Sequence, residues 1–281
     1  MPSSNDGYVS AETRTVSVEG TDFAYRMTGD PSGVPVILLN HLAGVLDDWD
    51  PRVVDCIAAK HWLITFDNRG IGSSGGATPE TVKEMAEDAI AFIRALGFTE
   101  VDIFGFSLGG CVAQEVVLKA PELVRKLILA GTGPAGAVGA EKIPAMAYRN
   151  QLRSLLTFTD VRTYLFFTRT RNGREQAKAF LKSVSQRTVD KDKSISLTSF
   201  RSQLKAIRTF ALRDDPDLSG IQQPVLVANG ESDSMVPSVN SAHLALGIPN
   251  AKLVLYKDAG HGGIFQWHAE FVEEALKFLG D

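Results

Sequence analysis

Apolar residues along this chain follow two alternating patterns: short, almost fully apolar runs and longer stretches with helical spacing. The short runs predict buried strands at Val34–Leu39, Val101–Phe104, Lys126–Ala130, Pro224–Ala228 and Ala251–Tyr256. Most segments between them repeat apolar residues every three or four positions, as helices that cover a sheet do. The alternation predicts an α/β protein with a mostly parallel central sheet flanked by helices.

The segments Thr13–Val18 and Thr21–Met27 alternate apolar and polar residues more strictly. We expect them to form an antiparallel hairpin at one edge of the sheet. Further on, Thr78-Pro79-Glu80 has the order of a helix cap followed by proline, so a helix is expected to begin there. Its buried face would consist of Val82, Met85, Ala89, Ile93 and Leu96.

The middle of the chain differs, because the strand pattern stops there. Helical patterns take over, as in Tyr148–Leu156, Val161–Phe167 and Arg174–Val184. We therefore expect a helical cap over residues 136–215, inserted before the strand at 224–228. Residues 1–135 and 216–281 would together form the core domain, a size that allows one large hydrophobic core.

Composition changes this picture mainly by exclusion. The chain has 281 residues, of which 44% are hydrophobic and 22% charged, as in ordinary globular proteins. Two cysteines argue against a disulfide framework, and no apolar run approaches the ~18 residues of a membrane span. The first dozen residues are polar, so we expect a cytoplasmic protein. The sequence has no metal-spaced His/Cys cluster and no phosphate loop, so we expect no cofactor, metal, nucleic-acid or membrane partner.

The segment from Phe104 to Gly110 carries the main chemical signal, because it reads Gly-x-Ser-x-Gly. The pattern is common by chance, yet here a strand precedes it and a helical stretch to Ala120 follows. A sharp strand-to-helix turn holds its central residue in a strained conformation and exposes the side chain above the sheet. We interpret Ser107 as a nucleophile, with Gly105 and Gly109 allowing the strand and the helix to approach closely.

A serine hydroxyl needs a general base, and the base needs a group that orients it. His261 follows the last predicted strand and is flanked by glycines, which makes it the candidate base. Asp233 follows the strand at 224–228 and is the candidate acid, with Glu231 as the alternative. Asp258 is expected to support the histidine loop. All three candidates follow the carboxyl ends of strands, where parallel sheets place their sites.

A tetrahedral oxyanion needs two backbone N–H donors. One is expected from Leu108, directly after the nucleophile. The loop after the strand at 34–39 is expected to supply the other, from Leu42. Cys111, one helical turn after Ser107, is interpreted as a small packing residue.

Together these motifs resemble the α/β-hydrolase superfamily, in the branch of the enol-lactonases and the cofactor-free haloperoxidase-like esterases. Residues 67–74 resemble its Asp-x-Arg-Gly-x-Gly-x-Ser segment, and Trp49 and the Asp-Ala-Gly-His run at 258–261 also match. Many relatives have His-Gly where this chain has Asn40-His41, which places a second imidazole near the expected site. Related dehalogenases and epoxide hydrolases have an aspartate at the position of Ser107, so the serine favours acyl transfer.

The predicted cap is also basic, with 16 Lys and Arg against 7 Asp and Glu in a chain of net charge −4. This skew suggests either attraction of an anionic substrate, with Arg169, Arg171 and Arg174 as the first candidates, or a solvated helical surface. Aromatic residues there would form either an apolar substrate wall or the core of the cap. Our candidate substrate-binding residues are His41, Phe158, Tyr164, Phe166 and Val236.

The resulting expectation is a serine hydrolase that cleaves a small to medium carboxylic ester or lactone through an acyl-enzyme. Three alternatives remain open. Hydrogen peroxide would serve as acyl acceptor in a perhydrolase or haloperoxidase-like enzyme. The same residues would cleave a carbon–carbon bond in ring-fission products. The fold would also serve a small-molecule sensor without catalysis. The sequence leaves the oligomeric state undefined.

Overall fold

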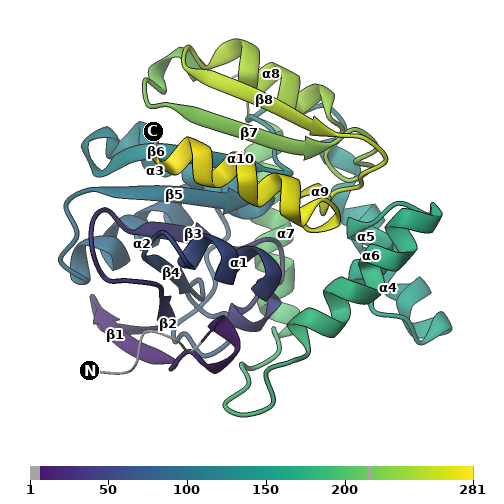
Figure 1. Cartoon of the computed structure of the whole chain (residues 1–281), viewed down its shortest axis with the longest axis horizontal. Helices are drawn as coiled ribbons and strands as arrows, with labels where there is room; N and C mark the ends of the chain where they lie inside the picture. Colours follow the sequence, from purple (N-terminus) through teal and green to yellow (C-terminus); the bar gives the residue numbers. More distant parts are fainter. Residues whose placement is uncertain (1–6, 214–216, 281) are drawn as a thin grey trace.

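A twisted, mostly parallel sheet forms the centre of the protein, as a computed structural model of residues 7–213 and 217–280 shows (Figure 1). Within these residues the strand order is β1-β2-β4-β3-β5-β6-β7-β8. The strands are β1 Arg14–Val18, β2 Thr21–Thr28, β3 Val36–Leu39, β4 Leu63–Phe66, β5 Val101–Phe106, β6 Val124–Ala130, β7 Val225–Gly230 and β8 Ala251–Tyr256.

The expected edge hairpin is confirmed, since β1 and β2 pair antiparallel with Arg14 opposite Tyr25. β2 also pairs antiparallel with β4, and the pairs from β4 to β8 are parallel. The carboxyl ends of β5, β7 and β8 therefore lie along the same edge of the sheet, and it is from this edge that the candidate residues project.

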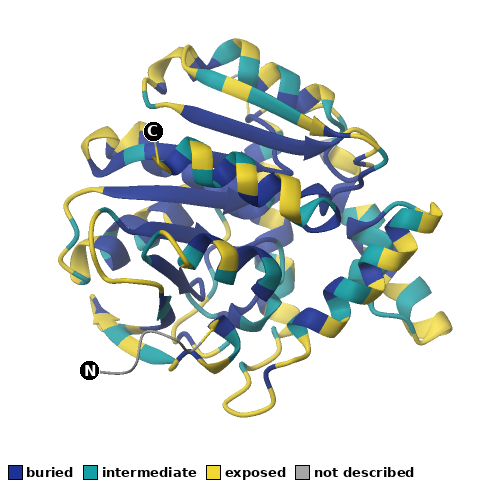
Figure 2. Cartoon of the chain, in the orientation of Figure 1, coloured by how far each residue is buried: buried dark blue, intermediate teal, exposed yellow. Residues whose placement is uncertain are grey.

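Helices cover both faces of the sheet (Figure 1). The helices on one face are α1 Pro51–Ala58, α9 Gly263–Gln266 and α10 His268–Gly280, and those on the other are α2 Val82–Ala95, α3 Leu108–Lys119 and α8 Val239–Gly247. Alternate side chains of β3 serve the two layers: Ile37 and Leu39 pack with α2 and α3, whereas Val36 and Leu38 pack with α1 and α10. Figure 2 shows the buried strands between the partly exposed helices.

The start predicted for α2 was wrong by three residues. Thr81, rather than Thr78, is the N-cap, because its Oγ1 accepts a hydrogen bond from Glu84 N at 3.2 Å. Thr78 instead donates to Gly70 O at 3.1 Å. Four members of the predicted face are buried, and the fifth, Leu96, lies half-buried just after the helix.

The described residues between β6 and β7 form helices and connecting loops. The helices are α4 Ile143–Thr157, α5 Val161–Phe166, α6 Arg171–Val184 and α7 Leu197–Ala211. α4, α5 and α6 extend beyond the end of the sheet, whereas α7 lies against α2 and α3 (Figure 1). The domain boundary predicted at 215 and 216 lies outside the described residues, and the division into core and cap stays a prediction.

None of the helices in residues 7–213 and 217–280 has the length and hydropathy to cross a bilayer. Five short 3-10 turns complete the described part of the fold. The turns are Tyr8–Ser10, Leu46–Asp48, Pro121–Leu123, Ala140–Lys142 and Leu218–Gly220.

Candidate active site

The turn between β5 and α3 presents Ser107 in a strained backbone conformation, with φ 55° and ψ −115°. Glycines make this turn sterically allowed. A Cβ on Gly105 would lie 2.4 Å from Gly109 O, and a Cβ on Gly109 would lie 2.0 Å from Leu39 O. Both positions therefore require glycine, as the sequence analysis expected, because the start of α3 lies in direct contact with β3 and β5.

Three side chains from separate loops form one hydrogen-bonded series. His261 Nε2 lies 2.9 Å from Ser107 Oγ, and His261 Nδ1 lies 2.8 Å from Asp233 Oδ2. A carboxylate only accepts, so Nδ1 carries the proton and Nε2 is free to accept the serine hydroxyl proton. The structure thus brings together the three residues that the sequence singled out, from the ends of β5, β7 and β8.

Asp233 is held by its own loop. Its Oδ1 accepts hydrogen bonds from Met235 N at 2.8 Å and Val236 N at 2.9 Å, and its side chain is fully buried beside the imidazole. Such amide donors keep the carboxylate oriented toward His261. Glu231, the alternative acid, is exposed and lies outside this series. Asp258 accepts from Thr170 Oγ1 at 2.8 Å and so braces the histidine loop.

The two expected oxyanion donors flank Ser107. Leu108 is the first residue of α3, where N–H groups have no partner within the helix. In the loop after β3, His41 N donates to Asn40 Oδ1, Ala43 N to Gln203 Oε1 and Gly44 N to His41 O. Within the described residues, the amide of Leu42 has no acceptor. It is therefore available to a ligand.

A mostly apolar pocket opens beside Ser107, with a cavity volume of only about 40 Å³. None of the lining side chains carries a formal charge. The connection between β6 and β7 contributes Thr132, Gly133, Pro134, Ala137, Val138, Ile143, Ile207, Phe210 and Ala211, and the rest of the lining is Leu42, Ser107, Leu108, Cys111, Met235, Val236 and Asn240. Burial raises the pKa of the Cys111 thiol to about 11, so it lines the pocket as a neutral group.

His41 lies beside this pocket without lining it. Its Nδ1 is 2.8 Å from Leu42 O, and because a carbonyl accepts, Nδ1 carries the proton. The ring packs edge to face against Phe106 and Phe166, with centroids 5.5 and 5.1 Å apart. Burial lowers the pKa of the imidazole, which keeps it neutral at neutral pH. Its buried Nε2 has no hydrogen-bond partner among the described residues.

Of the predicted aromatic substrate wall, Phe166 alone contacts the site. Its ring centroid lies 5.9 Å from that of His261, and its carbonyl accepts from Gly262 N at 2.8 Å. Phe158 is 98% exposed at the end of α4, and Tyr164 packs under Arg153. None of the three lines the pocket.

Among the lining residues that sequence reasoning missed are Ile207, Phe210 and Ala211 on α7. They share the buried face of α7 with Gln203 and Ser199, and the glutamine among these residues was the signal available in the sequence.

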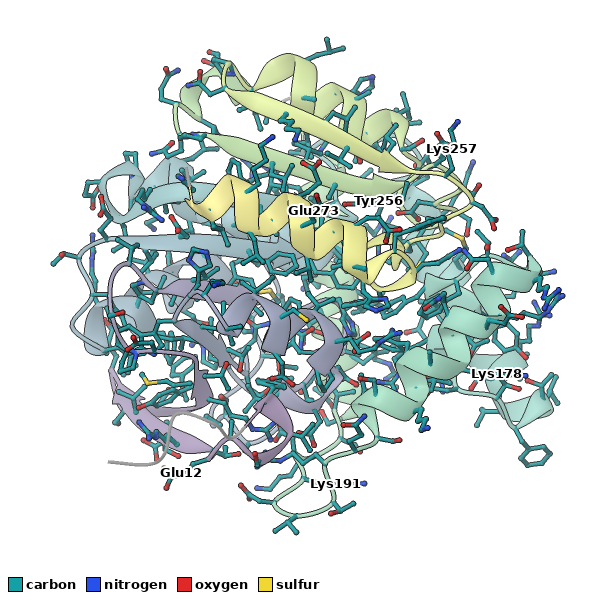
Figure 3. The ribbon with its side chains drawn as sticks, in the orientation of Figure 1. Glu12, Lys178, Lys191, Tyr256, Lys257 and Glu273 are labelled. Atoms are coloured by element: carbon teal, nitrogen blue, oxygen red, sulfur yellow. The ribbon has the colours of Figure 1, made fainter. Side chains whose placement is uncertain are left out.

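Several basic side chains of the connection between β6 and β7 lie on its outer surface, whereas Arg187 is buried and Arg162 pairs with Asp48 and Asp160. Arg171 pairs with Glu175, and Arg174 donates to Arg169 O. Figure 3 shows Lys178 on α6 and Lys191 on the loop before α7, both at the periphery. The three arginines singled out from the sequence therefore lie away from the pocket lining.

The strand order, the strained serine turn and the loops after β7 and β8 define the class of the α/β hydrolases. Comparison of the sequence with protein families agrees. The chain belongs to the alpha/beta hydrolase fold family, whose sequence profile matches residues 34–266.

The chain is also similar to individual proteins of this family. An alpha/beta hydrolase fold protein from Chitinophaga pinensis is 35% identical, with a TM-score of 0.93 over 98% of this chain and 99% of that one. A non-heme haloperoxidase from Rhodococcus erythropolis is 27% identical over 87% of this chain and 90% of its own. The enol-lactonase from Burkholderia xenovorans LB400 shares the fold, at 20% identity and a TM-score of 0.76 over 95% and 100%. Both branches that the sequence resembled are thus represented.

Proposed function

We propose that this protein is a serine hydrolase that cleaves a small to medium carboxylic ester or lactone through an acyl-enzyme. One observation carries the proposal: the series Ser107–His261–Asp233 ends at a pocket bordered by the free amide of Leu42 and the first amide of α3. Nucleophile, base, orienting acid and oxyanion donors are the parts that acyl transfer needs.

In the first half of the reaction Ser107 Oγ attacks the ester carbonyl carbon, and His261 Nε2 takes the hydroxyl proton. Asp233 stabilises the imidazolium that forms. The amides of Leu42 and Leu108 donate to the tetrahedral oxyanion. When the carbon–oxygen bond breaks, His261 gives its proton to the alkoxide, and the alcohol leaves an acyl-serine.

In the second half His261 removes a proton from water, whose oxygen attacks the acyl carbon. Collapse releases the carboxylic acid and returns the proton to Ser107. The uncharged pocket favours a neutral, compact acyl group. Charged residues of the helical connection would then affect only the approach of the substrate.

The test is hydrolysis of p-nitrophenyl esters from acetate to octanoate by the wild type, Ser107→Ala and His261→Ala. Both variants are expected to lose about three or more orders of magnitude in kcat. Ser185→Ala and His243→Ala, which remove exposed side chains, are the matched controls and should keep wild-type rates. Activity that survives in Ser107→Ala would refute the proposal.

The haloperoxidase relative favours a second candidate, in which hydrogen peroxide replaces water as the acyl acceptor. The product would be a peracid, which oxidises bromide without a cofactor. Bromination that needs both a carboxylic acid buffer and Ser107 would support this activity. Turnover of a vinylogous diketone, or tight ligand binding without turnover, would instead indicate a carbon–carbon hydrolase or a sensor.

A further inference from the structure

The loop that carries the Leu42 amide is held mainly by its own residues. Asn40 Nδ2 donates to Val45 O at 2.7 Å, and His41 Nδ1 donates to Leu42 O at 2.8 Å. Ala43 adopts a left-handed conformation, with φ 63°. A non-glycine residue in this region is strained and persists only where its surroundings hold it.

One restraint on the loop comes from far away in the sequence. Ala43 N donates to Gln203 Oε1 at 2.7 Å, across a separation of 160 residues. Because the partner is an N–H donor, the oxygen of the Gln203 amide must face the loop. The side chain is completely buried, and its Nε2 has no hydrogen-bond partner among the described residues.

A half-satisfied buried amide is a poor device for stability. Leaving a buried polar group unpaired costs about 1–3 kcal/mol, whereas an apolar side chain of the same shape has no such cost. The single bond that Gln203 makes is to the strained residue next to Leu42. This bond therefore accounts for a glutamine on the buried face of α7.

The same face of α7 forms part of the pocket wall. Ile207, Phe210 and Ala211 line the pocket and follow Gln203 at four, seven and eight residues, on one side of the helix. One rigid element thus touches both the oxyanion loop and the space beside Ser107.

We propose that Gln203 is a positioning residue, which holds the Ala43 peptide so that the neighbouring Leu42 amide stays directed at the oxyanion. The inference rests on the proposed function and deepens it. Without the glutamine oxygen, the Ala43 N–H would turn toward another acceptor. The Leu42 peptide, one residue away, would turn with it. The loss would fall on the transition state rather than on substrate binding.

The test compares Gln203→Met, which keeps the shape but removes the acceptor, with Gln203→Glu, which keeps an oxygen. A fluorophosphonate probe reports directly on the site: Ser107 Oγ forms a bond to phosphorus, the phosphorus–fluorine bond breaks, fluoride leaves, and His261 takes the proton. Gln223→Met is the matched control, because it removes a glutamine bond to the Pro121 carbonyl away from the site.

We expect Gln203→Met to be phosphonylated about 10- to 100-fold more slowly than the wild type. Its kcat on esters should fall to a similar degree, whereas its KM should stay within about twofold of the wild-type value. Gln203→Glu should label at least about fivefold faster than Gln203→Met, and Gln223→Met should equal the wild type. A purely structural role would lower the melting temperature without this division between kcat and KM.

The outcomes separate the two proposals. A wild type that the probe does not label would refute the serine hydrolase itself. A labelled wild type with equal rates in Gln203→Met, or equal losses in the Met and Glu variants, would overturn the role of Gln203 alone. If Gln203→Met does not fold, the labelling rate of Gln203→Glu is compared with that of the wild type. A rate within about tenfold of the wild type supports the role of Gln203, and a slower rate overturns it.

Discussion

Two helices of the same connection, α7 and α4, make opposite use of their apolar residues. α7 buries Leu204, Ile207 and Phe210 against the core, next to the pocket. α4 instead exposes large apolar residues, and Phe158 beyond its end is 98% exposed. The exposed apolar residues of α4 are Tyr148, Leu152, Leu155 and Leu156.

The difference lies in how each helix is attached. Ser199 Oγ on α7 donates to Gly70 O at 2.9 Å, Lys205 pairs with Glu80, and Gln203 bonds to Ala43. These three contacts join α7 to two loops, the one after β3 and the one between β4 and α2. α4 mainly contacts other helices of the connection. α7 is therefore a fixed wall of the site, whereas α4 contributes to the pocket only through Ile143 at its start.

The largest expected effect is on Phe210, which is 5% exposed and lines the pocket. Phe210→Ala should lower the free energy of unfolding by about 3–5 kcal/mol, since it leaves a cavity in α7's buried face. The enlarged pocket should also move the preferred ester toward longer acyl chains. Urea unfolding and the p-nitrophenyl ester series measure the two effects.

The same substitution in the outer region is the control. Phe158→Ala removes an exposed ring, so the free energy of unfolding should change by no more than about 0.5 kcal/mol, with unchanged chain-length preference. Similar losses at Phe158 and Phe210 would show that the comparison between the two helices is wrong.

The second prediction concerns pH, because a pair of carboxyl groups joins the segment before α7 to the core. Leu46 N donates to Asp67 Oδ1 at 2.9 Å and to Asp192 Oδ2 at 3.2 Å. Burial, together with the adjacent Asp192, raises the pKa of Asp67 well above its usual range. Although burial opposes ionisation, hydrogen bonds from Asp67 and Ser73 lower the pKa of Asp192.

The raised pKa of Asp67 means that the folded protein binds this proton more tightly than the unfolded chain does. Its contribution to stability is complete below the ordinary aspartate pKa and is lost as pH rises through the folded-state pKa. Asp67→Asn, which keeps a hydrogen-bond donor toward Asp192, should flatten this decline, by at most ~1.4 kcal/mol per pH unit. Urea unfolding from pH 5 to 9 measures the slope, and an unchanged slope would contradict the prediction.

The smallest effect should again fall on Phe158, whose φ of 51° is left-handed. Glycine adopts this conformation at the end of a helix without steric cost, although it also increases the entropy of the unfolded chain. Phe158→Gly should therefore raise the free energy of unfolding over that of Phe158→Ala by only about 0.5 kcal/mol. Calorimetry of the pair tests this, and a less stable glycine variant would refute it.

Residues at strand ends could be predicted from the sequence, because a parallel sheet places those ends together. Ser107, Asp233 and His261 each follow a recognisable apolar run, so their meeting at hydrogen-bond distance required only the correct strand order. The free amide of Leu42 followed from its place after β3.

The helical connection was harder, since apolar spacing does not say what a helix packs against. Phe158 and Tyr164 have the spacing of a buried face, yet no core element covers them. The lining role of Ile207 depends on α7 docking between the loops at Ala43 and Gly70, which no local pattern contains. The Thr78 cap failed for a similar reason, because Thr81 offers the better-placed acceptor.

The distance along the chain between Ser107 and His261 has a consequence for biosynthesis. The two residues that share a hydrogen bond are 154 positions apart. At about 5–20 residues per second, a ribosome needs on the order of 8–30 seconds to travel from one to the other. Throughout that interval the serine turn, even if already folded, has no base. Under the proposed mechanism, Ser107 therefore acquires its base only when β8 and its loop join the sheet.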